Sequence, residues 1–335
     1  MTQQPATVDR TNDMSYDDAL AVFIGADASY SGGLSNHGPM AAEALVSLGQ
    51  ADWMGRFVSH YRGRLEAPSV EISPAPADWR PWLDAQLPEL VPHAANLLGH
   101  GLLRVAHAVR GIERVETTGI ASATQLQELA IAVDYWRSGG TGIAGPARLS
   151  GSESIGDWLR SLELLPAFEA PGGSLNVTLV RAAAMPSFVE RMSALAPAAD
   201  PATTLDALSA AAASACARNV GLNAFTLLHG ATVSSMARVL LGHLDEDGAR
   251  ALESSVVGFV AAAVVGFDEQ AAAEAGEMSA AGEVLDAAQL AADAAATLDE
   301  HTIKFADACI GVASRIGDDA PLAALRQQLQ TPYGV

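Results

Sequence analysis

Along most of the chain, apolar residues recur at intervals of three and four positions, with polar residues between them. This spacing gathers the apolar side chains on one face of an α-helix and predicts a largely helical protein. Ser15 followed by Asp18 forms a capping-box pattern that opens a first helix running through Val22. Further helices are predicted at residues 40–48, 53–61, 88–109, 122–136, 154–165, 203–217, 219–242, 247–266, 280–296, 298–315 and 321–329.

Three stretches depart from the helical pattern. Residues 29–35 contain glycine and serine and predict a loop before His37, and residues 137–151 hold five glycines and predict a second loop. Residues 176–181 (NVTLVR) form the only short segment compatible with a strand. The pattern as a whole predicts an all-α fold, with one large helical domain at 15–330 after a disordered lead at 1–14.

Composition agrees with closely packed helices. Half of the 335 residues are hydrophobic but only 5% are aromatic, and alanine is abundant. Strands favour β-branched and aromatic residues, so this balance favours helices. The longest apolar stretch, residues 254–267, has 14 residues, whereas a membrane-spanning helix needs about 20. We therefore expect a buried core helix there and no membrane association.

The charge balance narrows the choice of partners. The formal net charge is −20, which repels nucleic acid and anionic membrane surfaces, so neither is an expected partner. Cys216 and Cys309 lie far apart in apolar stretches and are expected to be buried free thiols. The polar, acidic start of the chain does not resemble a secretory signal, so we expect a cytoplasmic protein. The oligomeric state stays open.

Two histidine-containing segments occur in each half of the chain. His37 and His229 each precede a glycine, and a Leu-Gly pair follows each of them about three turns later. His100 and His301 begin a second pair of similar segments, 63 and 72 residues further on. These similarities suggest two pseudo-duplicated helical halves that each offer two histidines to one buried metal site.

Lys304 is the only lysine in the chain, beside 18 arginines. Thr297 and Glu300 form a possible capping box, which would place His301 and Lys304 early in a helix and on one face of it. The neighbouring residues are mostly apolar, so Lys304 is expected to point into a core. Alternatively, it reaches solvent, or pairs with a nearby carboxylate: Asp299, Glu300 or Asp307.

A buried lysine has a chemical consequence. Burial disfavours the ammonium ion and lowers the pKa of Lys304 towards the neutral amine. The neutral amine can add carbon dioxide and become a carbamate, which is an anionic oxygen ligand that a metal ion would hold in place.

Four motifs, in this order, resemble those of the questin oxidase-like family, which includes fungal enzymes that tailor anthraquinone polyketides. They are residues 35–40 (SNHGPM), 100–104 (HGLLR), 227–232 (LLHGAT) and 301–304 (HTIK). The resemblance covers roughly residues 15–316 and is low outside these motifs. Arg104 departs from the family pattern because it stands where the family has a second histidine.

The resemblance implies a non-haem iron oxygenase that uses O2 to cleave a carbon–carbon bond of an aromatic polyketide such as an anthraquinone. Its Fe(2+) would be held by four histidines, His37, His100, His229 and His301, and by a CO2-derived carbamate on Lys304. His301 and Lys304 would also be the residues closest to the catalysis. His107 lies two helical turns after His100 on the same face and is held in reserve as a ligand or as a neighbour of one.

Other readings remain open. The family has also been described as performing Baeyer–Villiger chemistry with NADPH, which would need a dinucleotide-binding site. The Gly-rich segment at residues 140–145 matches a dinucleotide-binding motif but lacks the preceding strand that such a site needs. A helical ligand-binding protein without turnover is the other alternative. Asn36, and Asp299 or Asp307, are candidates for groups that orient the imidazoles; for the two aspartates the alternative is a solvated surface carboxylate. Five aromatic residues are candidates for a flat aromatic pocket, with core packing as the alternative for each: Trp53, Phe57, Tyr135, Trp136 and Phe225.

Overall fold

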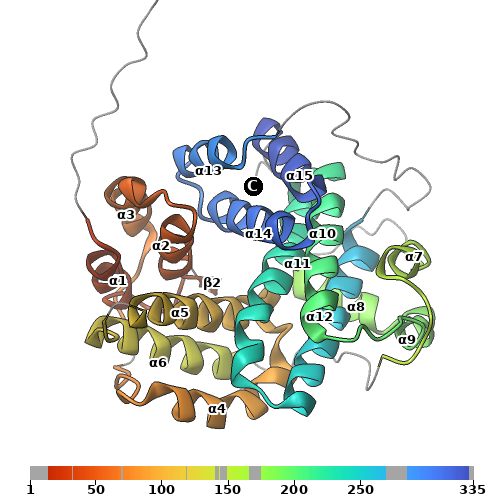
Figure 1. The fold of residues 1–335 in the computed structure, drawn as a ribbon, viewed down its shortest axis with the longest axis horizontal. Coiled ribbons are helices and arrows are strands. Elements are labelled where there is room, and N and C mark those ends of the chain that lie inside the picture. The colour runs from red at the N-terminus through yellow and green to blue at the C-terminus, as the bar shows by residue number, and fades with distance from the viewer. Residues whose placement is uncertain are drawn as a thin grey trace, which may run out of the picture.

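The computed structural model describes residues 14–331, apart from 32, 69–70, 118, 140–142, 144–148, 166–174 and 269–284. Within these residues the chain forms fifteen α-helices and one short antiparallel hairpin, so the predicted all-α fold is confirmed (Figure 1). The hairpin pairs β1 (Ser29–Tyr30) with β2 (Leu34–Ser35), in the segment that was expected to be a loop.

The helices agree with the apolar pattern over most of the chain. Their bounds in the first half are α1 (Tyr16–Ile24), α2 (Gly38–Ser47), α3 (Met54–Tyr61), α4 (Trp79–Leu90), α5 (His100–Glu116), α6 (Ala123–Ser138) and α7 (Ile155–Arg160). In the second half they are α8 (Leu175–Ala183), α9 (Pro186–Met192), α10 (Pro201–Arg218), α11 (Gly221–Leu240), α12 (Glu246–Phe267), α13 (Ala287–Ala296), α14 (Glu300–Ile316) and α15 (Ala320–Gln330). Side-chain caps set several starts: Ser15 and Ser122 complete capping boxes, as predicted for Ser15.

Three predicted elements are wrong. The single helix expected at 88–109 is broken, because Leu97, Leu98 and Gly99 have positive φ angles of 51°, 57° and 78°. Only glycine adopts this conformation without strain, so the chain turns here and α5 starts afresh at His100. The possible strand at 176–181 lies inside helix α8. The cap of α14 is Asp299, whose carboxylate accepts the amide of Thr302, rather than Thr297.

Some predictions fall outside the described residues. The disordered lead at 1–14 lies outside them except for its last residue, as do most of residues 140–148, which include the Gly-rich text. Residues 280–284, at the start of the helix expected at 280–296, also lie outside; the described helix there begins at Ala287.

Four helices form the centre of the molecule: α2, α5, α11 and α14 (Figure 1). Each packs against the next, so that they close a ring in the order α2, α5, α11, α14 and back to α2. Two of them come from the first half of the chain and two from the second, while α1 and α3 pack outside α2, and α10 and α12 pack outside α11. The pseudo-duplication itself stays a hypothesis.

Two helices are long and apolar enough to cross a membrane by length and composition. They are the segments 221–243 and 246–267, and in each the most apolar window is 78% buried inside the fold. Their apolar residues are therefore accounted for by packing, as expected for the core helix that contains residues 254–267.

Candidate metal centre

The four histidines of the sequence motifs converge inside the ring of helices. His37 is the N-cap of α2, His100 is the first residue of α5, His229 lies in the middle of α11, and His301 is the second residue of α14. All four are at most 7% exposed. One ring nitrogen from each lies within 4.8 Å of the corresponding nitrogen of every other. Residues up to 264 positions apart in the sequence thus meet at one point.

The glycine that follows each of the first two histidines permits this convergence. A Cβ at Gly38 would lie 2.4 Å from the ring of Phe23, and one at Gly101 would lie 2.6 Å from the ring of Trp136. Neighbouring helices therefore approach the backbone directly beside His37 and His100. The His-Gly pairs of the sequence motifs reflect this close packing.

Backbone and side-chain contacts fix the start of α2. The amide of His37 donates to Tyr61 Oη at 2.8 Å. The Asn36 side chain donates to the carbonyl oxygens of Phe23 and Asp27, and its Oδ1 accepts the amide of Gly38 at 3.1 Å. Asn36 therefore holds the backbone around His37. The sequence had made it a candidate for orienting the imidazole, which these hydrogen bonds do not contact.

The Nε2 atoms of three histidines face one another. His100 Nε2 lies 2.7 Å from His37 Nε2 and 3.2 Å from His229 Nε2. Nitrogen ligands of one octahedral metal ion with metal–nitrogen bonds of about 2.1 Å lie about 3 Å apart. The observed separations bracket that value.

The other ring nitrogens of two of these histidines are engaged by the backbone. His229 Nδ1 lies 2.8 Å from the carbonyl oxygen of Phe225, and His100 Nδ1 contacts that of Leu97. A carbonyl oxygen only accepts, so each Nδ1 carries the proton, and a neutral imidazole then has a bare lone pair at Nε2. Two bare nitrogens thus face each other at 3.2 Å between His100 and His229, with no proton to join them.

Protonation does not relieve this contact. Burial holds the pKa of all four histidines below the ordinary value, and the nearby charge of Lys304 lowers each pKa further. The pKa of His229 falls to about 3. The four imidazoles are therefore neutral near pH 7, and their lone pairs are available to a cation.

Lys304 lies one helical turn after His301 and is 2% exposed. Among the described residues its Nζ has no hydrogen-bond partner, and burial lowers its pKa to about 7. It neither reaches solvent nor donates to one of the three carboxylates considered above. Asp307 pairs with Arg110, Glu300 pairs with Arg64 at 3.1 Å, and Asp299 accepts the amide of Thr302. The lysine thus presents an amine that is easily neutralised beside four neutral imidazoles.

Phe225 forms an apolar wall of the centre. Its ring centroid lies 4.8 Å from that of His229 and 4.7 Å from that of His301. The other aromatic residues proposed for one flat pocket are dispersed: Phe57 stacks on Tyr61, and Trp136 donates to the carbonyl oxygen of His93. Trp53 contacts Arg56, and Tyr135 contacts Ser35, so the predicted aromatic pocket is not formed by these five residues.

His107, the reserve ligand, belongs to a different group. Its Nδ1 lies 2.7 Å from Glu43 Oε2, and Glu43 in turn accepts hydrogen bonds from Arg110 and Arg114. Arg110 also donates to Asp307 at 2.6 Å. His107 thus lies with Glu43 and Asp307, and His100 is the α5 histidine that joins the group of four.

Sequence reasoning missed this buried ionic network. Its one signal was Glu43, a lone acidic residue in the apolar run at 40–46. Glu43 is fully buried. Burial alone would raise its pKa, but Arg110 and His107 hold the pKa of Glu43 well below its usual range. A charged carboxylate at this place requires partners from other helices, and a sequence pattern does not reveal them.

Comparisons of the chain with protein-family models, with curated proteins and with solved structures find no match. The resemblance to the questin oxidase-like family therefore depends on the sequence motifs alone. The site itself is described by its own geometry: four buried neutral imidazoles and one buried lysine, which together form a suitable donor set for a metal ion.

Proposed function

We propose that the chain is a non-haem iron oxygenase that opens a ring of an aromatic polyketide, such as an anthraquinone, by oxidative carbon–carbon bond cleavage. The observation that carries the proposal is the pair of bare Nε2 atoms of His100 and His229, 3.2 Å apart in a buried core. Two facing lone pairs repel each other, and a bound cation turns this repulsion into two coordinate bonds. The binding of a metal therefore removes an unfavourable contact of the metal-free fold.

The donor set supports a first-row transition metal. Four imidazoles suit iron, copper, nickel or zinc, whereas magnesium and calcium prefer oxygen ligands. Among these metals the resemblance to the questin oxidase-like family favours Fe(2+). His37, His100, His229, His301 and an oxygen from Lys304 would hold this metal, which would supply a place for O2 or substrate to bind.

The carbamate on Lys304 is supported by charge. In helices α2, α5 and α14 the histidine lies within one residue of the start of the helix, and helix N-termini carry partial positive charge. Three positive helix ends repel a bound dication, and this repulsion is offset by an anionic ligand nearby. Neutral Lys304 supplies it by forming an N–C bond to CO2: one C=O bond opens to give the second carboxylate oxygen, and the nitrogen releases a proton. The four imidazoles are neutral, so the Fe(2+) centre keeps a net charge of +1, which attracts a deprotonated phenol.

The groups that contact the histidines have defined parts in this proposal. The carbonyl oxygens of Leu97 and Phe225 hold the protons of His100 and His229 at Nδ1, which aims their lone pairs at the metal. Phe225 excludes water beside His229 and His301. Bound iron supplies a redox-active position at which O2 is activated.

The proposal is tested by incubating the iron-loaded protein with an anthraquinone and O2 and following ring opening by mass spectrometry. Turnover without a nicotinamide supports the proposed oxygenase. A strict requirement for NADPH would favour Baeyer–Villiger oxygen insertion, and tight binding of the anthraquinone without conversion would favour a binding protein. Either of these two outcomes contradicts the proposed reaction.

The role of Lys304 has its own test. Protein equilibrated with 13C-labelled bicarbonate should give one carbamate carbon signal in its NMR spectrum, and Lys304→Ala should lose it. Because Lys304 is the only lysine, the assignment is free of overlap from other lysines. A signal that persists in Lys304→Ala, or no signal in the zinc-substituted wild type, would show that Lys304 is not carboxylated.

A further inference from the structure

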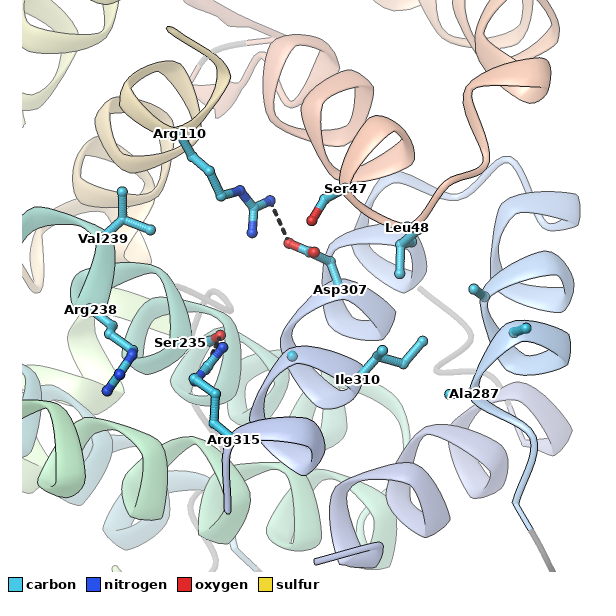
Figure 2. A pocket seen from close by; sticks show the side chains of 13 residues that line it. Ser47, Leu48, Arg110, Ser235, Arg238, Val239, Ala287, Asp307, Ile310 and Arg315 are labelled. Atoms are coloured by element: carbon cyan, nitrogen blue, oxygen red, sulfur yellow. Dashed lines mark hydrogen bonds and ion pairs between the residues drawn. The ribbon is translucent and has the colours of Figure 1, made fainter. Parts of the chain in front are cut away.

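A polar cavity is lined by the same four helices that carry the histidines and by α13. Its volume is about 480 Å³, and Figure 2 shows the side chains that converge on it. It is lined by Ser47 and Leu48 at the end of α2, by Arg110 of α5, by Ser235, Arg238 and Val239 of α11, by Ala287, Ala288 and Ala291 of α13, and by Asp307, Ile310, Gly311 and Arg315 of α14.

This cavity is separate from the histidine centre. Ser47, Arg110, Arg238 and Ile310 each follow the histidine of their own helix by nine or ten residues. At a rise of 1.5 Å per residue, these residues lie about 14 Å further along their helices than the histidines do. None of the four histidines lines the cavity, so these helices carry two distinct sites.

Two arginines are held in place at one side of the cavity. Asp206 of α10 accepts Arg238 Nη1 at 3.0 Å through one oxygen and Arg315 Nε at 2.8 Å through the other. Arg315 Nη2 also lies 3.3 Å from Ser235 Oγ. Among the described residues these contacts leave Nη2 of Arg238 and Nη1 of Arg315 without a protein acceptor. A carboxylate behind the two guanidinium groups thus orients them and leaves donors for a ligand.

Arg110 stands on the opposite side of the cavity. Its guanidinium bonds to Asp307 (Figure 2). It also bonds to Glu43, which is paired with Arg114 as well. These ion pairs and those of Asp206 together contain four arginines and three carboxylates, which leaves one positive charge in excess. The arginines are Arg110, Arg114, Arg238 and Arg315, and the carboxylates are Glu43, Asp206 and Asp307. A positive site of this kind is notable in a chain whose net charge is −20.

The rest of the cavity wall is aliphatic. Leu48, Val239 and Ile310 contribute apolar side chains, and the alanines of α13 close the side opposite α11. Arginine is the preferred partner of a carboxylate because its planar group donates two parallel hydrogen bonds. We propose that this cavity binds a small organic carboxylate, with its head group between Arg238 and Arg315 and its aliphatic body against α13 and Ile310.

Titration calorimetry with hexanoate, hexanamide and inorganic phosphate tests the proposal. Hexanoate should bind at one site per chain, whereas hexanamide, which has the same body and no charge, should bind at least about tenfold more weakly. Phosphate should also bind more weakly than hexanoate because it lacks the aliphatic body. Equal binding of hexanoate and hexanamide, or tighter binding of phosphate, would overturn the proposed ligand class.

Two variants locate the binding. Arg238→Gln removes a charged donor and should weaken hexanoate about tenfold. Ala288→Trp fills the cavity from an exposed position on α13 and should weaken binding with all arginines intact. The matched control Arg56→Gln, on the exposed side of α3, should bind as the wild type does. Hexanoate that binds both Arg238→Gln and Ala288→Trp with unchanged affinity is bound elsewhere, for example at the histidine centre, and the proposal is then wrong.

Discussion

A buried ion pair next to the histidine centre offers a quantitative test of the fold. Arg104 lies one helical turn after His100 on α5, and its guanidinium donates to Glu128 of α6 at 2.6 and 2.8 Å. The two side chains are 0% and 2% exposed. Removing one partner of such a pair leaves the other charge in the core without compensation, whereas removing both leaves an apolar contact.

The expected cost of Arg104→Met is about 3–5 kcal/mol in the free energy of unfolding, because Glu128 is then buried alone. At about 2.1 cal/mol/K of unfolding entropy per residue, this corresponds to a fall in Tm of about 4–7 °C. Glu128→Leu leaves Arg104 buried without its partner and should lower the free energy of unfolding by a similar amount. The double variant Arg104→Met/Glu128→Leu should recover most of the loss, so the sum of the two single losses should exceed the double loss by about 5 kcal/mol or more.

Chemical denaturation followed by circular dichroism, with the four proteins freed of metal, measures this cycle. Metal content is the second readout: Arg104 is not a donor, so the double variant should bind as much metal as the wild type. Additive losses, with the double variant about twice as destabilised as either single one, would refute the burial and pairing of Arg104 with Glu128.

Three further predictions concern the backbone, the ionic network and the thiols. In denaturant titrations Gly99→Ala should destabilise the protein by about 2 kcal/mol more than Gly49→Ala. Both glycines have positive φ, but only at Gly99 would a Cβ meet a valine side chain, 2.2 Å away. Equal losses of stability would contradict the turn before α5. The pKa of Glu43 is held well below its unfolded value of 4.5, so its ion pairs stabilise the fold above about pH 4.5, and this stability is lost as the pH falls further. The difference in stability between the wild type and Glu43→Gln, measured by urea unfolding between pH 7 and 3, should therefore become smaller in acid. A constant difference would show that the network is absent. Burial raises the pKa of Cys216 to about 12 and that of Cys309 well above its ordinary value, so a thiol reagent should label neither in the native protein and both in denaturant; rapid native labelling would show that these helices are not packed as described.

The helical elements were accessible from the sequence because they depend on local signals. The capping box at Ser15 starts α1 as predicted, and the apolar spacing of residues 298–315 agrees with α14 to within two residues. The break before His100 was missed because two leucines, rather than only glycine, adopt positive φ there. Local preference disfavours that conformation, so tertiary packing must impose it.

The candidate site was predictable only in part. The four histidines were singled out by motifs that each contain a histidine, and the structure brings His37, His100, His229 and His301 together. Their orientation depends on the backbone carbonyl oxygens of Leu97 and Phe225, which no side-chain pattern reveals. The partner of His107 was equally hidden, because Glu43 lies 64 residues away in the sequence.

The central claim is that the four buried histidines bind one metal ion, and the most direct measurement is the iron content of anaerobically reconstituted protein by plasma mass spectrometry. His229→Ala removes a central donor, whereas the control His243→Ala removes a histidine that contacts Asp84 and Glu113 outside the centre. We expect about one iron per chain in the wild type and in His243→Ala, and a sharp fall in His229→Ala. No bound metal in the wild type, or the same content in all three proteins, would contradict this claim.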